Sequence, residues 1–330
     1  MRSLASLGLG GGLRRLVSPS YLGFDRNLFR AALSPEQKVA IFRRYVRRIE
    51  VEVHSFCNRK CWFCPNSFID RRSEIHRLDM GVFRSLLTSL AAIEYRHEMT
   101  FCKYNEPFAD ESTFEAIALA RSAIPRATLR LNSNGDYLDA PTLKRAYDCG
   151  LRYLYVSLYT NEPSYDNASM RAHGQKIIRR LEGAQFRLVA DIPDREVNYD
   201  GRYKDLRITL RGRNFRVEGV NRGGIAVCRE ASNRINPCFM PFWYISVEYN
   251  AQVMPCCNIR SDNPQEAALS LGTLSEANSI FDLYASPQAV AWRRRMHGFA
   301  KKTGPCAQCT MGREPSNIIN RMLCRLTRPF

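Results

Sequence analysis

The sequence has no run of about 18 consecutive apolar residues, so we expect no membrane-spanning segment. It also lacks a convincing export signal. The apolar stretch near the N-terminus is short, is broken by four glycines and leads into Arg14 and Arg15 without a small-residue cleavage pattern. We therefore predict a globular cytoplasmic protein whose 12 cysteines stay reduced or bind metal, rather than form disulfides.

The sequence has few acidic residues relative to basic ones: 32 Asp and Glu against 49 Lys and Arg, which gives a formal net charge of +17. Such a balance favours an anionic partner. The basic segments, however, lack the interleaved aromatic residues on which nucleic-acid bases stack. We interpret the arginines chiefly as a solvated surface, and a nucleic-acid partner or an RNA-modifying activity remains a remote alternative.

Short β-rich runs alternate with helical stretches from Ile49 onward. The strand candidates are residues 49–53, 99–104, 128–134, 153–159, 186–192 and 214–220. Six such runs separated by helices predict parallel βα units with right-handed crossovers, too few for an eight-stranded barrel. We expect an α/β fold with a partial (β/α)6 TIM-like barrel, whose chemistry gathers at the carboxyl ends of the strands.

Changes of pattern divide the chain into four regions. Residues 1–48 form a basic leader and a helix that starts at Ser34 and Pro35, with Gln37 completing a capping box. We expect the barrel in residues 49–220, a small cysteine-rich domain in 221–312 and a basic tail in 313–330. In the cysteine-rich domain, the sequence predicts a β-hairpin that turns at residues 250–251, and one helix over residues 279–296.

Three cysteines follow the first predicted strand in the stretch HSFCNRKCWFC, at Cys57, Cys61 and Cys64. The spacing C-x3-C-x2-C allows three thiolates from one loop to hold three irons of a [4Fe–4S] cluster, which leaves the fourth iron open. A zinc site would need a fourth ligand nearby, and the local sequence offers none in a paired arrangement. An open iron can bind a cofactor or substrate.

This motif, with Phe63 as the aromatic residue before the last cysteine, resembles the radical S-adenosylmethionine (SAM) superfamily, and the resemblance covers residues 49 to 312. It implies that SAM binds the open iron through its amino and carboxylate groups. It further implies that an electron from an external reductant, such as flavodoxin or ferredoxin, cleaves SAM. The 5′-deoxyadenosyl radical then abstracts a substrate hydrogen.

The same resemblance suggests further residues that bind SAM. The stretch YNEP stands where the family usually has Gly-Gly-Glu, and Glu106 suits the methionine ammonium group. Ser157 matches a position that contacts the ribose, while Asn132 and Asn134 belong to the same rim. For Asn134, a simple turn with Gly135 is an equally good interpretation.

A second group of cysteines lies in the C-terminal region, at Cys238, Cys256, Cys306 and Cys309. Four thiolates can enclose a cluster fully. The pattern resembles the shortened SPASM module called the twitch domain, which implies a second, auxiliary [4Fe–4S] cluster. A zinc ribbon is the alternative, and Cys257 is the alternative to Cys256 as ligand.

The residues leave the substrate open. The resemblance to enzymes with a twitch domain implies oxidation or epimerisation of a small polar molecule, such as a sugar or aminocyclitol, with modification of a ribosomal peptide or a protein side chain as the alternative. Cys228 is unexplained by either cluster. It is a candidate hydrogen donor to a substrate radical, or a buried small apolar residue.

Overall fold

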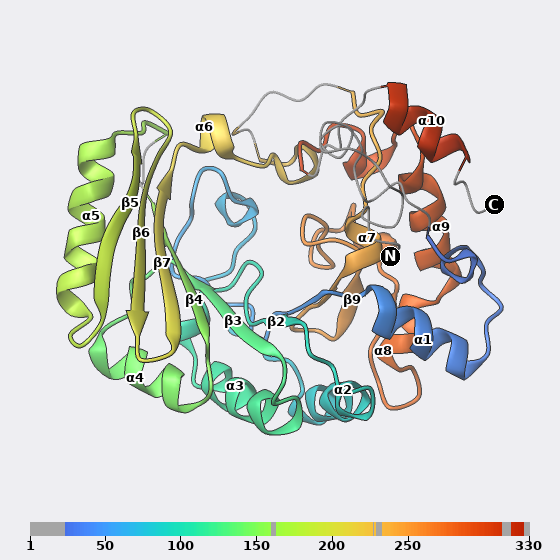
Figure 1. Cartoon of the computed structure of the whole chain (residues 1–330), viewed down its shortest axis with the longest axis horizontal. Coiled ribbons are helices and arrows are strands. Elements are labelled where there is room, and N and C mark those ends of the chain that lie inside the picture. The colour runs from blue at the N-terminus through green and yellow to red at the C-terminus, as the bar shows by residue number, and fades with distance from the viewer. Residues whose placement is uncertain (1–23, 160–162, 227, 229–232, 312–317, 327–330) are drawn as a thin grey trace, which may run out of the picture.

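The computed structural model describes residues 24–159, 163–226, 228, 233–311 and 318–326. They build one curved ten-stranded sheet with helices along its outer side (Figure 1). The strand order is β10-β9-β8-β1-β2-β3-β4-β7-β6-β5. The strands are β1 (Arg48–Val51), β2 (Glu98–Thr100), β3 (Thr128–Ser133), β4 (Tyr153–Leu158), β5 (Gln185–Ile192), β6 (Glu196–Tyr203), β7 (Leu206–Arg213), β8 (Tyr244–Val247), β9 (Gln252–Met254) and β10 (Gly272–Thr273).

The centre of the sheet is parallel, as expected for a partial TIM-like barrel. Strands β8, β1, β2, β3, β4 and β7 pair in parallel, which gives six parallel strands. The carboxyl ends of these strands meet at one edge, so the loops that follow them lie together. The fold class predicted from the sequence is therefore confirmed.

Five of the six predicted strands are present, and one is wrong. Residues 186–192 form a strand as predicted, but β5 is an antiparallel edge strand rather than part of a parallel βα unit. Residues 214–220 contain the short helix α6 (Phe215–Glu218) instead of a strand. Asn214 caps this helix, because its side chain accepts a hydrogen bond from the amide of Arg216 at 3.0 Å. The parallel positions are taken instead by β7 and β8.

Strands β6 and β7 were not predicted from the sequence, and in β6 polar residues and a glycine interrupt the apolar alternation. In β6 the buried positions include Val197, Tyr199 and Gly201. A Cβ atom at Gly201 would lie 2.3 Å from the ring of Phe186 on β5, so this position accepts only glycine without rearrangement. The glycine that weakened the strand pattern therefore permits close packing of the meander.

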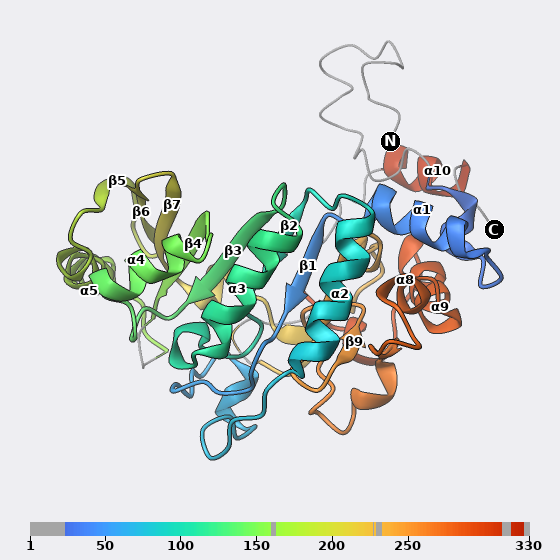
Figure 2. The same ribbon diagram turned by 90° about the horizontal axis from the view of Figure 1, so that it is seen from below.

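Helices α2 to α5 cover the outer side of the sheet (Figures 1 and 2). The capping box predicted at Ser34 is present, and Ile41, Phe42 and Tyr45 form the buried face of its helix. The helices are α1 (Pro35–Tyr45), α2 (Met80–Ala92), α3 (Ser112–Ala123), α4 (Ala140–Asp148), α5 (Asn167–Arg180), α7 (Met240–Trp243), α8 (Ile280–Tyr284), α9 (Pro287–His297) and α10 (Ile318–Leu326).

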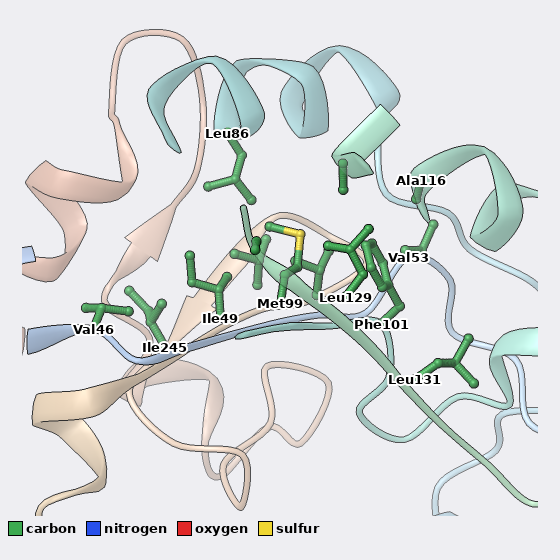
Figure 3. Close-up of a cluster of buried hydrophobic side chains, with 14 of the residues drawn as sticks. Val46, Ile49, Val53, Leu86, Met99, Phe101, Ala116, Leu129, Leu131 and Ile245 are labelled. Atoms are coloured by element: carbon green, nitrogen blue, oxygen red, sulfur yellow. The ribbon is translucent and has the colours of Figure 1, made fainter. Parts of the chain in front are cut away.

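The main hydrophobic core lies between the sheet and these helices. Figure 3 shows Ile49 and Val53, from β1 and the residues that follow it, on the same side as Leu86 of α2. All three side chains are almost fully buried. Since side chains alternate along a strand, Glu50 and Glu52 must point to the opposite, inner face.

The C-terminal region joins the same sheet rather than forming a separate one. Strand β8 pairs with β1 and makes the predicted hairpin with β9, whose turn contains Ala251 at a φ of 63°. The single helix predicted over residues 279–296 is wrong: it is two helices, because Ser286 caps a new helix that begins at Pro287.

The two terminal regions predicted from the sequence are only partly described. Residues 1–23 of the predicted region 1–48 lie outside the described residues. Within the predicted tail, residues 318–326 form helix α10. In the described part of the chain, no helix combines the length and apolar character needed to cross a membrane.

Candidate functional site

A cavity of about 210 Å³ opens at the carboxyl ends of the parallel strands. Its walls come from β1, β3 and β4, from the loops after β1, β2 and β7, and from the loop after β9. The lining residues are Glu50, Cys57, Arg59, Cys61, Phe63, Cys64, Asn66, Cys102, Lys103, Tyr104, Asn105, Glu106, Asn132, Ser133, Asn134, Tyr155, Ser157, Tyr159, Arg213, Arg222 and Cys257. The three cysteines after β1 therefore face the cavity, at the place that the fold class predicts.

The thiols of these three cysteines lie close together. Burial, together with the neighbouring thiols of Cys64 and Cys57, raises the pKa of Cys61 to about 12. Burial likewise raises the pKa of Cys57 to about 11. The backbone of the loop is fixed, since the amide of Cys57 donates to the carbonyl of Arg71 and that of Cys64 donates to the carbonyl of Cys61, both at 2.9 Å. Three facing thiols at an open cavity fit a cluster with one free iron.

The cysteine loop is tied to the end of β3. Arg59 donates from Nε and Nη2 to the two carboxylate oxygens of Asp136, at 2.6 and 2.5 Å. Asn58 donates to the same carboxylate at 2.7 Å, and its own carbonyl oxygen accepts from Nδ2 of Asn134 at 2.8 Å. Asn134 therefore orients the loop as well as lining the cavity.

Glu106 lies at the end of the loop after β2, is 1% exposed and faces the cavity. Its carboxylate accepts hydrogen bonds from Ser133 Oγ at 2.7 Å, from the Asn134 amide at 2.6 Å and from the Phe108 amide at 3.3 Å. Burial raises its pKa to about 7, although these hydrogen bonds oppose the shift. A carboxyl group held this way is positioned to accept a hydrogen bond from an ammonium group.

The other residues predicted to contact SAM also line the cavity. Ser157 and Asn132 lie on neighbouring strands at its rim. Phe63 stacks on Phe215 with ring centroids 3.5 Å apart and an interplanar angle of 5°. This contact packs the cysteine loop against helix α6. Their roles toward SAM stay predictions.

The second group of cysteines gathers in the C-terminal region. A hydrogen bond to Cys257 and burial raise the pKa of Cys256, and the nearby thiols of Cys238 and Cys309 raise it further. Burial raises the pKa of Cys306 to about 12, again with Cys238 and Cys309 as neighbours. Cys238 and Cys309 are thus neighbours of both Cys256 and Cys306, and four thiols that share neighbours in this way fit a cluster with four protein ligands.

Cys256 and Cys257 differ in one respect. Both are neighbours of Cys238, but Cys257 also lines the cavity that the first three cysteines face. The choice of Cys256 as the ligand stays a prediction. Cys228 packs in a small apolar cluster with Phe63, and its thiol donates to the carbonyl of Val220 at 3.4 Å. It is not among the described residues that line the cavity, and its role as a hydrogen donor stays a prediction.

The sequence did not predict the buried ion pairs near the cavity. Arg71 pairs with Glu52 at 3.0 Å and with Asp262 at 2.7 Å, and Lys103 pairs with Glu248. These ion pairs connect β1 and the loops after it to the C-terminal region. One feature of the sequence did indicate them. In the first strand, Glu50 and Glu52 alternate with apolar residues, so if the apolar side packs on the helices, the glutamates must face the barrel interior.

Comparison with known proteins identifies the family. The model of the radical SAM superfamily matches residues 51–185, and the model of the SPASM iron–sulfur cluster-binding domain matches residues 238–310. The chain is a radical SAM enzyme. Both matched segments contain the cysteines described above, and the second supports a SPASM or twitch-like C-terminal domain.

Similar proteins agree with this enzyme class. The radical SAM enzyme is 25% identical over 263 residues to the S-adenosyl-L-methionine-dependent 2-deoxy-scyllo-inosamine dehydrogenase of Niallia circulans, over 79% of this chain and 91% of that protein. A crystal structure of BtrN in complex with AdoMet and 2-DOIA has a TM-score of 0.60 and 22% identity, over 80% of this chain and 93% of that one. An open conformation of BtrN has a TM-score of 0.52 and 18% identity, over 80% and 92% of the two chains.

The cofactors of this radical SAM enzyme are SAM, a [4Fe–4S] cluster that binds it and an auxiliary [4Fe–4S] cluster. The donor sets fit, since three thiols face the cavity and four others form a separate group. When bound, the cluster and SAM supply one-electron cleavage of SAM and an acceptor for a substrate hydrogen atom. The protein supplies position and water exclusion.

Proposed function

We propose that this enzyme oxidises a hydroxyl group of a small polar substrate, of the aminocyclitol or sugar type, to a ketone. The observation that carries this proposal is the cavity that the first group of cysteines lines together with Cys257. Its described lining is rich in hydrogen-bonding groups, including Glu50, Lys103, Asn105 and Arg222. Such groups suit a molecule with several hydroxyl or amino substituents.

The relation to the Niallia circulans dehydrogenase supports the same substrate class. That protein acts, by its name, on an aminocyclitol, and it matches across most of both chains. Oxidation also needs an acceptor for the second electron. An auxiliary cluster near the cavity supplies one, and Cys257, next to the proposed ligand Cys256, lines that cavity.

We assign the ligands on this basis. Cys57, Cys61 and Cys64 hold the SAM-binding cluster, and Glu106 binds the ammonium group of SAM. The auxiliary cluster is held by Cys238, Cys256, Cys306 and Cys309. The domain boundaries near residues 48, 220 and 312 belong to this proposal, as do an external one-electron reductant such as flavodoxin and a location in the reducing cytoplasm.

The test is turnover by the anaerobically reconstituted protein with SAM, a chemical reductant and a panel of aminocyclitols and amino sugars. We expect 5′-deoxyadenosine and a ketone in equal amounts. With a substrate deuterated at the reacting carbon, deuterium should appear in the 5′-deoxyadenosine. An inverted alcohol with solvent deuterium in place of the ketone would indicate epimerisation instead. Absence of any product from the panel would contradict the substrate class.

A further inference from the structure

Three buried glutamates lie on or beside the inner face of the sheet, and one differs from the other two. Glu52 is paired with Arg71, and Glu248 with Lys103. Glu50 is 9% exposed, yet among the residues that the structure describes it forms no ion pair. A carboxyl group removed from water without a cation is unfavourable, so its retention calls for a functional explanation.

Glu50 is held at one oxygen only. The hydroxyl group of Tyr244, on the adjacent strand β8, donates to Oε2 of Glu50. Within the described part of the chain, Oε1 has no hydrogen-bond donor, while the residue lines the cavity shared with the SAM-binding cysteines. The geometry presents one carboxyl oxygen to whatever occupies the cavity.

The groups around Glu50 leave it able to exchange a proton near neutral pH. Burial raises its pKa to about 8, and the nearby Cys257 thiol contributes to the rise. The hydrogen bond from Tyr244 and the charges of Lys103 and Arg222 oppose it. Lys103 cannot neutralise Glu50 fully, because its ammonium group is bound to Glu248 and to the carbonyl of Ile259.

We propose that Glu50 accepts the hydroxyl proton of the substrate as the alcohol becomes a ketone, and that Tyr244 is the positioning residue for it. Oxidation of an alcohol removes two electrons and two protons. The proton of the hydroxyl group passes to Glu50. Bound SAM would supply the acceptor for the hydrogen atom on the carbon, and an auxiliary cluster held by Cys238, Cys256, Cys306 and Cys309 would take up the remaining electron. The carbon–oxygen bond thereby becomes a double bond. This inference rests on the proposed oxidation.

The experiment compares the parent with Glu50→Gln, Glu50→Asp and Tyr244→Phe, all reconstituted with iron. We expect Glu50→Gln to lower ketone formation by about 100-fold or more, the usual range for loss of an acid–base group. Iron content, substrate affinity by calorimetry and deuterium transfer to 5′-deoxyadenosine should persist, which separates proton removal from folding and binding. Glu50→Asp should restore part of the rate.

The pH profile provides the second measurement. Ketone formation by the parent should rise with pH through about 8, because the ionised carboxylate is the acceptor, and the profile of Glu50→Gln should be flat. Tyr244→Phe should move the midpoint to higher pH, since it removes a hydrogen bond that lowers the pKa of Glu50. This shift keeps the test decisive if Glu50→Gln fails to fold.

The outcomes separate the two proposals. A parent that forms ketone, with a Glu50→Gln variant equal to it in rate and pH profile, would refute the role of Glu50 alone. If Glu50→Gln does not fold, an unmoved profile in Tyr244→Phe would refute it instead. A parent that forms no ketone would refute the oxidation and the role of Glu50 together, because no hydroxyl proton is then lost.

Discussion

The two groups of cysteines are built in opposite ways. Cys57, Cys61 and Cys64 come from one loop, so a stretch of eight residues carries all three thiols, and the contact with Asp136 then fixes the loop to the end of β3. The second group spans residues 238 to 309 and joins segments that only the tertiary fold brings together. With three proposed ligands, the first group would leave one iron of its cluster open to the cavity. With four, the second group would enclose its cluster completely. Local sequence therefore defines the site that binds SAM, whereas packing defines the auxiliary site.

The largest expected effect follows from removing the three cysteines of the first group. A variant with Cys57, Cys61 and Cys64 all changed to Ala should form no 5′-deoxyadenosine, because no cluster remains to bind SAM. Its iron content after reconstitution should fall from about eight to about four per chain, as expected for two [4Fe–4S] clusters. Iron and zinc analysis measures both sites together. Four irons in the parent with one zinc would overturn the auxiliary cluster.

The dispersed group is tested by two adjacent residues. Cys256→Ala should lose the iron of the auxiliary cluster and ketone formation, while SAM cleavage persists. Cys257→Ala should keep about eight irons, because Cys256 remains as the fourth thiol of the auxiliary group and Cys257 also lines the cavity. Iron content and the electron paramagnetic resonance spectrum of the reduced protein distinguish the variants. The opposite pattern would make Cys257 the ligand.

The connection between the two regions is tested at Arg71. Arg71→Met should lower the free energy of unfolding by about 3–5 kcal/mol, because Glu52 would be left buried without its cation, whereas Asp262 keeps its pair with Arg260. Arg84→Met is the matched control: its pair with Glu115 is exposed, and the expected change is within about 0.5 kcal/mol. Urea unfolding of the two variants measures the difference. Equal stabilities would contradict the importance of the buried pair.

The smallest effect concerns SAM affinity. Glu106→Gln should weaken SAM binding about tenfold or more, since a charged acceptor becomes neutral. Ser133→Ala removes one hydrogen bond to the same carboxylate and should change the affinity less. Calorimetry with the reconstituted protein measures both. An unchanged affinity in Glu106→Gln would remove Glu106 from the SAM site.

The sequence predicted what depends on short-range patterns. The motif at Cys57–Cys64, the capping box at Ser34 and the first four parallel strands were visible in spacing and composition. Strand β8 was recognised only as half of a hairpin, because nothing in four consecutive residues reveals which distant strand they pair with. The hydrogen bond that holds Glu50 depends on that pairing too, since its donor, Tyr244, comes from β8. Long-range contacts therefore account for most of what was missed.

The pairing of β8 with β1 has a consequence for how the protein forms during synthesis. Arg48 lies beside Tyr244, about 200 residues later in the chain, so β1 has only one of its two neighbours until most of the polypeptide has left the ribosome. The cysteine loop follows β1 directly. The final shape of this loop is thus reached late, and insertion of the SAM-binding cluster is expected to follow completion of the chain.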